Sequence, residues 1–252
     1  ITIKSEREIE LMAEAGKILE RVHNELEKAL RPGMSTKDID TLGEEIIRSY
    51  GCIPSFLNYN GYPASICVSV NQEVVHGIPD KHRIIQEGDI VSLDAGVIYK
   101  GYHSDAARTH AVGEVSEEAK KLIQVTKESF FEGIKFAKAG NHLFDISGAI
   151  GRYAEERGYG VVRDLCGHGI GTALHEAPEI PNYEVGRKGV RLRPGMTLAI
   201  EPMINIGTHE VDWLDDDWTV VTRDGSLSAH YENTILITEG EPRILSLTCE
   251  NE

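Results

Sequence analysis

The 252-residue sequence is 40% hydrophobic and 27% charged, a composition typical of a globular protein rather than of a disordered or membrane-spanning one. Its formal net charge of −15 argues against a non-specific binder of nucleic acid or of anionic membranes. The four cysteines, Cys52, Cys67, Cys166 and Cys249, form no CxxC pair, so we expect free thiols in a reducing compartment. Because the N-terminal segment lacks the apolar core of a signal peptide, we expect a cytoplasmic protein.

The first fifty residues predict two helices. Apolar residues recur at helical spacing from a capping box at Ser5 and Glu8 to residue 30, where Arg31-Pro-Gly33 ends the pattern. A second helix is expected from Ser35 to Gly51, with Ser35 and Asp38 as its start signal. After it we expect an aromatic loop at residues 54–65, a strand at 66–70 and a turn at 71–79.

A hairpin carrying Asp94 and Asp105 is predicted next, in residues 90–113. If its turn is centred on Tyr99 and Lys100, the two aspartates lie directly opposite each other, with Cβ atoms about 4.5–5.5 Å apart. Like charges in that position repel each other. The hairpin therefore requires that the two carboxylates share either a proton or a cation.

The second half repeats this order of elements. Helices are expected from Ser116 to Ala137 and from Leu143 to Gly158. A strand at 160–165 and a glycine-rich loop at 167–178 follow, and further strands are predicted at 196–206, 218–222, 229–238 and 243–247.

Three pairs of short segments recur in the same order in both halves. Two pairs are offset by 107 residues and the third by 99. The pairs are Gly33 and Gly140, segments 88–94 and 195–201, and segments 76–79 and 175–178. We therefore expect one α/β domain over residues 1–252, whose halves, roughly 1–110 and 111–252, are related by pseudo-two-fold symmetry.

The repeat places Glu201 in a position equivalent to Asp94, so that both carboxylates point to one central site. Glu232 lies among apolar strand neighbours, and His168 lies between glycines that let a ligand approach closely. Taken alone, each of these residues is more often structural or solvated. Taken together, however, the site would contain four carboxylates and the imidazole of His168, which cannot all stay ionised at close range without cations. The carboxylates are those of Asp94, Asp105, Glu201 and Glu232. This donor set suits Mn, Fe, Co or Zn, and bridging carboxylates could hold two ions about 3.5–4 Å apart.

Four motifs, in this order, resemble those of the type I methionine aminopeptidases: DAGVIYKGYHSD, GHGIGTALHEAP, AIEPMI and HYENT. The resemblance implies the pita-bread α/β fold, with a central antiparallel sheet and helices on the outside. It implies metal-dependent removal of the initiator methionine from nascent proteins when the second residue is small, by a metal-bridging hydroxide. Nascent N-termini would be the partners, with proximity to the ribosome as a consequence. A monomer is expected, without direct binding of nucleic acid or membrane.

The resemblance also implies individual roles for the five candidate ligands. Asp94 would chelate one divalent ion and His168 the other. Asp105 and Glu232 would bridge both ions, and Glu201 would bind the His168 ion and shuttle protons. The cofactors would thus be two ions of Co, Mn, Fe or Zn.

Further positions match the substrate-binding residues of that family. His76 and His175 would contact the substrate and stabilise the tetrahedral intermediate. Carbonyls around Asn71 and Ser228 match a monovalent-cation site that some members carry. The methionine side chain would occupy a pocket formed by Tyr59, Tyr62, Cys67 and Trp218, with Phe56, Leu174, Met203 and His230 nearby.

Three alternatives remain at this point. An X-Pro aminopeptidase or prolidase shares the fold but carries an additional N-terminal domain, whereas this sequence begins with the catalytic half's helices. A type II methionine aminopeptidase would need an inserted helical subdomain, for which 252 residues leave no room. A non-catalytic pita-bread binding protein should lack ligands or histidines, and all seven positions are filled here.

Overall fold

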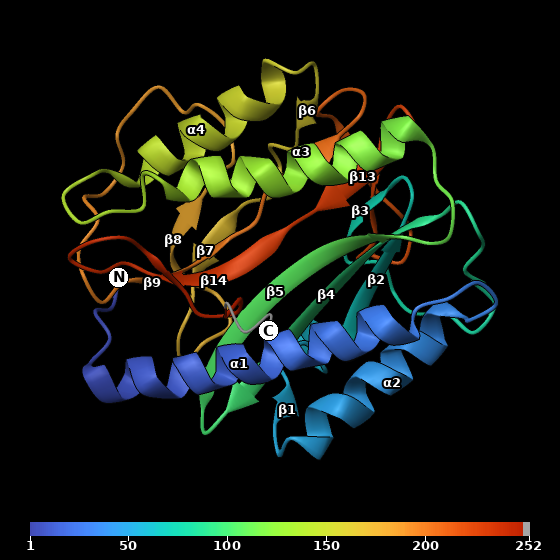
Figure 1. Cartoon of the computed structure of the whole chain (residues 1–252), viewed down its shortest axis with the longest axis horizontal. Helices are drawn as coiled ribbons and strands as arrows, with labels where there is room; N and C mark the ends of the chain where they lie inside the picture. The colour runs from blue at the N-terminus through green and yellow to red at the C-terminus, as the bar shows by residue number, and fades with distance from the viewer. Residues whose placement is uncertain (249–252) are drawn as a thin grey trace.

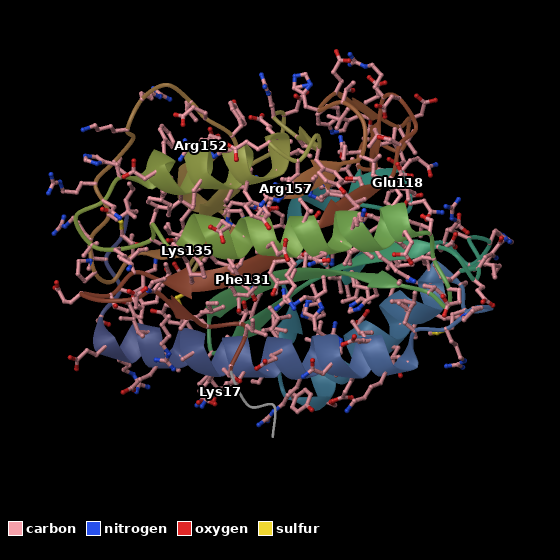
Figure 2. All side chains as sticks on the ribbon, turned by 45° about the horizontal axis from the view of Figure 1, so that its top comes forward. Lys17, Glu118, Phe131, Lys135, Arg152 and Arg157 are labelled. Atoms are coloured by element: carbon pink, nitrogen blue, oxygen red, sulfur yellow. The ribbon has the colours of Figure 1, made fainter. Side chains whose placement is uncertain are left out.

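The computed structural model describes residues 1–248 and has two pairs of helices on the outside of a twisted antiparallel sheet (Figure 1). Helices α1 and α2 cover one part of the sheet, and α3 and α4 cover another. Charged side chains such as Lys17 and Lys135 lie on the outer faces of the helices (Figure 2). The bounds are Glu6–Ala29 for α1, Thr36–Ser49 for α2, Glu117–Ile134 for α3 and Leu143–Glu155 for α4.

The main sheet has the strand order β1-β4-β5-β14-β9-β7-β8, with β2 paired to β4 and β15 paired to β14. Two three-stranded sheets, β13-β10-β6 and β11-β12-β3, flank it. The main-sheet strands are β1 (Ile53–Pro54), β2 (Ile66–Val70), β4 (Ile90–Tyr99), β5 (Tyr102–Ala111), β7 (Gly167–Gly169), β8 (Glu176–Ile180), β9 (Thr197–Ile200), β14 (Glu232–Leu236) and β15 (Arg243–Ile244). The others are β3 (Glu73–Val75), β6 (Gly160–Val161), β10 (Met203–Asn205), β11 (Val211–Trp213), β12 (Val220–Thr222) and β13 (Ser228–His230), and a short 3₁₀ helix spans Tyr59–Gly61.

The helices confirm the sequence prediction because their start signals are local. Both predicted capping boxes form: Ser5 pairs with Glu8 at the start of α1, and Ser35 pairs with Asp38 at the start of α2. The apolar faces of α1 and α2 pack against β2, β4 and β5 in one core, and those of α3 and α4 pack against β9 and β14 in a second. Burying these two faces fixes the sheet between the helix pairs.

The β4–β5 hairpin forms, but its predicted register is wrong by two residues. The turn is centred on Lys100 and Gly101, with φ of 48° and 87°, as a two-residue type I′ turn requires. Asp94 therefore pairs with Ala107, and Asp105 pairs with Gly96. Because a shift of two residues preserves the face to which each side chain points, the aspartates remain on one face as diagonal neighbours.

Two predicted strands are each broken where they pass from the main sheet into a flanking sheet. The 196–206 segment is divided into β9 and β10 at Glu201 and Pro202, and the 229–238 segment into β13 and β14 at Tyr231. Proline has no N–H to donate to the ladder, and the amide of Tyr231 instead donates to the carbonyl of Pro202. The register is the same on both sides of the break, which places Glu201 opposite Glu232.

The glycine-rich segment 167–178 is not the expected loop. It contributes β7 and the start of β8, so His168 lies on a strand between β8 and β9. The missing side chain of Gly167 allows this, since a Cβ there would lie 2.3 Å from the carbonyl oxygen of Ala199. The segment 71–79 likewise contains β3 rather than a turn alone, and β11 was not predicted.

The cysteines within the described residues are free thiols, as expected, and Cys249 lies outside that part of the chain. No helix within residues 1–248 combines the length and the apolar character that crossing a lipid bilayer requires.

Candidate metal centre

One cavity of about 230 Å³ opens over the main sheet, and its wall contains eleven of the residues predicted to act in the site. The five candidate ligands lie in it together with the two histidines and the four residues of the predicted methionine pocket. These are Asp94, Asp105, His168, Glu201, Glu232, His76, His175, Tyr59, Tyr62, Cys67 and Trp218.

The five candidate ligands come from five consecutive strands of the sheet. In the order β4, β5, β14, β9 and β7, the strands contribute Asp94, Asp105, Glu232, Glu201 and His168, with Glu201 directly after the end of β9. All five side chains project toward the same cavity. The fold thus assembles one row of donors from residues up to 138 positions apart in the sequence.

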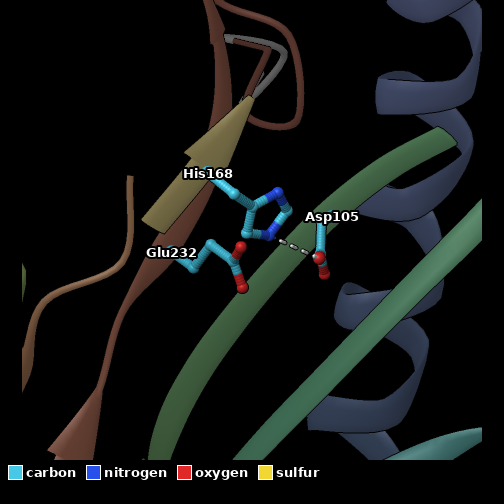
Figure 3. Close-up of side chains that lie close together, drawn as sticks. All are labelled: Asp105, His168 and Glu232. Atoms are coloured by element: carbon cyan, nitrogen blue, oxygen red, sulfur yellow. Dashed lines mark ion pairs between the residues drawn. The ribbon is translucent and has the colours of Figure 1, made fainter. Parts of the chain in front are cut away.

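The closest approaches are those expected of ligands that share an ion. His168 Nε2 lies 3.6 Å from Asp105 Oδ2 and 3.6 Å from Glu201 Oε1, and Asp105, His168 and Glu232 converge (Figure 3). Two ligands at about 2.0–2.2 Å from the same ion lie roughly 3–3.5 Å from each other. His168 Nδ1 donates to the carbonyl of Gly169 at 2.8 Å, which leaves Nε2 free to face the carboxylates.

Some carboxylate oxygens of the centre have no hydrogen-bonding partner in the described part of the chain. Within residues 1–248, Asp94 Oδ1, Asp105 Oδ1 and Glu232 Oε1 are buried and accept no hydrogen bond. Burial and the neighbouring carboxylates raise the pKa of Asp94 and of Glu232 well above the usual range. Such unpaired buried oxygens are costly, and a divalent cation would satisfy them. The residues present therefore fit a divalent metal.

His168 is drawn toward its charged form in the metal-free protein. Burial lowers the pKa of its imidazole, but the carboxylates of Asp105 and Glu201 outweigh burial, and the pKa is raised. A bound cation would compete with a proton for Nε2.

Two further histidines face the cavity in neutral form. Burial lowers the pKa of both His76 and His175. His175 Nδ1 lies 2.7 Å from the hydroxyl of Tyr59, so that Nε2 is free to act on a bound ligand. His76 has a φ of 58°, which is unfavourable for an L-residue. The next residue, Gly77, holds the backbone there: its carbonyl accepts from the amide of Val68, and its amide donates to Ser69 Oγ.

The predicted methionine pocket has apolar and aromatic walls. Tyr62 is buried, and its hydroxyl donates to the carbonyl of Ile66. Its ring lies edge-on to that of Trp218, with the ring centroids 5.1 Å apart. Burial, followed by the nearby Asp94, raises the pKa of the Cys67 thiol, which keeps it uncharged. Three of the four neighbouring positions expected from the sequence also line the cavity: Phe56, Leu174 and Met203.

His230, the fourth expected neighbour, does not line this cavity. Its Nε2 lies 3.2 Å from Glu201 Oε2, behind the carboxylates, and the side chain borders a different cavity. His230 is the first residue of the HYENT motif, two positions before Glu232, and that position was the available signal.

Two supporting residues were missed by the sequence analysis. Thr234 Oγ1 accepts a hydrogen bond from the amide of Asp105 and donates one to its carbonyl, at 2.9 and 2.8 Å. Arg108 binds Asn233 Oδ1 at 2.7 Å and also donates to the carbonyl of Glu232. The Asn and Thr of the HYENT motif were the available signal.

The segments predicted to hold a monovalent cation are adjacent. The amide of Ser228 donates to the carbonyl of Asn71 at 3.0 Å, and Asn71 has a φ of 57°. The cation itself stays a prediction.

The chain is similar to known proteins over almost its whole length. Residues 10–239 match metallopeptidase family M24. A methionine aminopeptidase of Clostridium acetobutylicum is 58% identical over 250 residues, covering 99% of this chain and 100% of that protein. The crystal structure of a methionine aminopeptidase from Thermotoga maritima has a TM-score of 0.96 at 48% identity, covering 98% of this chain and 100% of that one.

The structure of an Xaa-Pro dipeptidase from Bacillus anthracis is also similar, with a TM-score of 0.78 at 28% identity. It covers 98% of this chain, but this chain covers only 62% of it. The pita-bread fold expected from the sequence is thereby confirmed.

Proposed function

The chain belongs to metallopeptidase family M24, among its methionine aminopeptidases, and we propose that the row of five ligands is its catalytic centre. The enzyme removes the initiator methionine from protein N-termini. The observation that carries the proposed centre is the convergence of one donor from each of five consecutive strands, with three carboxylate oxygens that have no partner within residues 1–248.

The donor set supports binding of two divalent ions. We propose that Asp94 would hold one ion, that His168 and Glu201 would hold the other, and that Asp105 and Glu232 would contribute to both. When bound, Co, Mn, Fe or Zn ions lower the pKa of water so that hydroxide is available at neutral pH, and they polarise the scissile carbonyl.

The remaining chemistry falls to side chains of this chain. His76 and His175, held neutral by burial, donate hydrogen bonds to the substrate carbonyl oxygen as negative charge develops on it. Glu201 accepts the proton of the attacking water and delivers it to the leaving amine. The surrounding apolar wall excludes water, which strengthens these interactions.

The pocket supports selection of methionine. Tyr59, Tyr62, Cys67 and Trp218 present aromatic and sulfur surfaces, which suit a flexible thioether. A pocket with such apolar walls accepts an unbranched apolar side chain better than a charged one. We extend the specificity of the family to this chain and propose that a small second residue is required.

We further propose that residues 1–252 form a single catalytic unit of two related halves. Ser35, the residue before α2, forms an isolated β-bridge with Ile84. His142, the residue before α4, forms the equivalent bridge with Arg191, and both partners are displaced by 107 residues. Matched bridges at the predicted offset support this organisation.

The cellular setting is proposed from the substrate. New polypeptides present their N-termini in the cytoplasm as they leave the ribosome, and we propose that the enzyme acts there as a monomer. Binding of a monovalent cation near Asn71 and Ser228 is part of the same proposal.

The experiment that tests this function compares two peptides. Protein loaded with Mn²⁺ should release methionine from Met-Ala-Ser and no alanine from Ala-Pro-Ala. Release of alanine alone would favour the X-Pro peptidase, which the comparisons do not favour. Release of neither amino acid would favour a binding protein without activity.

A further inference from the structure

His230 is a buried histidine that the proposed mechanism does not use. It lies at the end of β13, is 1% exposed, and places Nε2 3.2 Å from Glu201 Oε2 and 3.9 Å from Glu232 Oε2. With Glu201 and Glu232 it forms a second convergent group of potential ligand atoms, which shares Glu232 with the Asp105–His168–Glu232 group.

The backbone holds this histidine firmly. Its amide donates to Thr109 Oγ1 and its carbonyl accepts from the same hydroxyl, both at 2.9 Å. Thr109 is in turn 2.8 Å from the hydroxyl of Ser92 on β4, so that β13 is fixed to β5 and β4. On the other side, His230 pairs with Met203 of β10.

The side chain lines one cavity and is not among the residues that line the substrate cavity. It borders a polar cavity of about 320 Å³ whose other walls include His23, Arg108, His110 and Lys127. That cavity is distinct from the one that holds the substrate-facing residues. His230 therefore approaches Glu201 from behind, where no substrate group reaches.

The two oxygens of Glu201 have different environments. Oε1 lies 3.6 Å from His168 Nε2, a separation too long for a good hydrogen bond and suited to two ligands of one ion. Oε2 lies within hydrogen-bond distance of His230 Nε2. A carboxylate held at one oxygen can rotate less, and so presents the other oxygen in a fixed direction.

We propose that His230 is a positioning residue: its Nε2–H donates to Glu201 Oε2 and thereby orients Oε1 toward the ion beside His168. The inference rests on the proposed metal centre. Partners of this kind typically change metal affinity by 10–100-fold when they are removed. His230 therefore contributes to metal affinity without binding the metal.

The test uses two substitutions that differ in one property. His230→Leu removes the donor and keeps an apolar side chain of similar reach, whereas His230→Gln keeps a side-chain N–H. Equilibrium binding of Mn²⁺ to metal-free protein, followed by the electron paramagnetic resonance of free Mn²⁺, is measured for each. We expect about 10–100-fold weaker binding for the Leu variant and binding within about threefold of the parent for the Gln variant.

His110→Leu is the matched control, because His110 borders the same rear cavity and faces Glu27 at 3.6 Å rather than the centre. It should bind Mn²⁺ as the parent does. Melting of each metal-free variant shows whether it is folded.

Parent-like binding by a folded Leu variant would overturn the inference. Equal weakening in the Leu and Gln variants would also overturn it, because the imidazole would then be a ligand itself. If the parent fails to bind Mn²⁺ at all, the proposed metal centre fails instead.

Discussion

Asp105 and His168 approach within 3.6 Å although two strands, β14 and β9, separate theirs in the sheet. In a flat sheet the backbones of β5 and β7 would lie about 14 Å apart, beyond the reach of an aspartate and a histidine. The sheet must therefore curve strongly at the site, as the ribbon shows (Figure 1). The centre depends on that curvature.

Metal should stabilise the fold, because the buried carboxylates repel one another without it. At a metal concentration about 100 times the dissociation constant, the expected gain is about 2.7 kcal/mol. For a chain of this size that corresponds to a rise in melting temperature of roughly 5–10 °C. Calorimetry before chelation, after chelation and after reloading with Mn²⁺ measures it. An unchanged melting temperature would count against the centre.

Gly167→Ala should displace the strand that carries His168. The new Cβ would lie 2.3 Å from the carbonyl oxygen of Ala199, and backbone on β9 cannot move away without breaking the ladder. We expect unfolding free energy to fall by about 1–3 kcal/mol and Mn²⁺ binding to weaken. Gly240→Ala, where no atom lies within 4 Å of the new Cβ, is the control. Equal Mn²⁺ affinity in both variants would refute the prediction.

Lys4 and Glu176 form a little-exposed ion pair of 2.6 Å beside His175. Burial alone would raise the pKa of Glu176, but Lys4 outweighs it and the pKa is lowered. Lys4→Met removes the counter-charge of that carboxylate and leaves it only the hydroxyl of Thr2 and the amide of Ala173, so we expect a loss of about 1–3 kcal/mol and a lower kcat/KM. Mn²⁺ affinity should not change, because neither residue is a candidate ligand or is hydrogen-bonded to one.

The double variant Lys4→Met/Glu176→Gln tests the cause of that loss. Without an unpaired charge, it should recover part of the stability in urea unfolding. If the double variant is no more stable than the single one, the charge is not the reason.

His23 should make the fold sensitive to acid. Its Nε2 donates to the carbonyl of Ala106 at 2.8 Å, and burial lowers its pKa from 6.5 to about 3. The unfolded chain therefore binds a proton that the folded chain does not between these values. Stability from this group is complete above about pH 6.5 and is lost toward pH 3, by at most about 1.4 kcal/mol per pH unit.

His23→Gln keeps a donor for Ala106 and removes the titration. Urea unfolding of metal-free parent and variant between pH 4 and 8 gives both slopes, and the carboxylates of the centre contribute equally to each. The variant should lose less stability as the pH falls. Parallel curves would show that His23 is not the titrating group.

Features that depend on neighbouring residues could be predicted from the sequence. The capping boxes at Ser5 and Ser35 formed as expected because each is complete within four residues. The hairpin was predicted correctly, but its register was not. The turn lies at Lys100 and Gly101 rather than at Tyr99 and Lys100, because glycine readily adopts the positive φ that a type I′ turn needs. The face to which Asp94 and Asp105 point survived the error, since it depends only on parity.

Features that depend on distant segments could not be predicted in the same way. A strand at His168 requires Ala199 and Glu179 as partners, and nothing near Gly-His-Gly indicates them. The side of the centre on which His230 lies is likewise decided by the break at Pro202 and Tyr231. The acidic candidate ligands were found because several acids among apolar strand residues are electrostatically unfavourable unless they bind a common cation.

The most direct test of the central claim follows metal occupancy and methionine release together. Metal-free parent and Asp105→Asn are titrated with Mn²⁺ in the presence of Met-Ala-Ser, and bound ion and free methionine are measured at each point. Release by the parent should rise with occupancy, while the folded variant should lose more than about 100-fold in kcat/KM. Parent-like release by Asp105→Asn, or release by the chelated parent, would contradict the account.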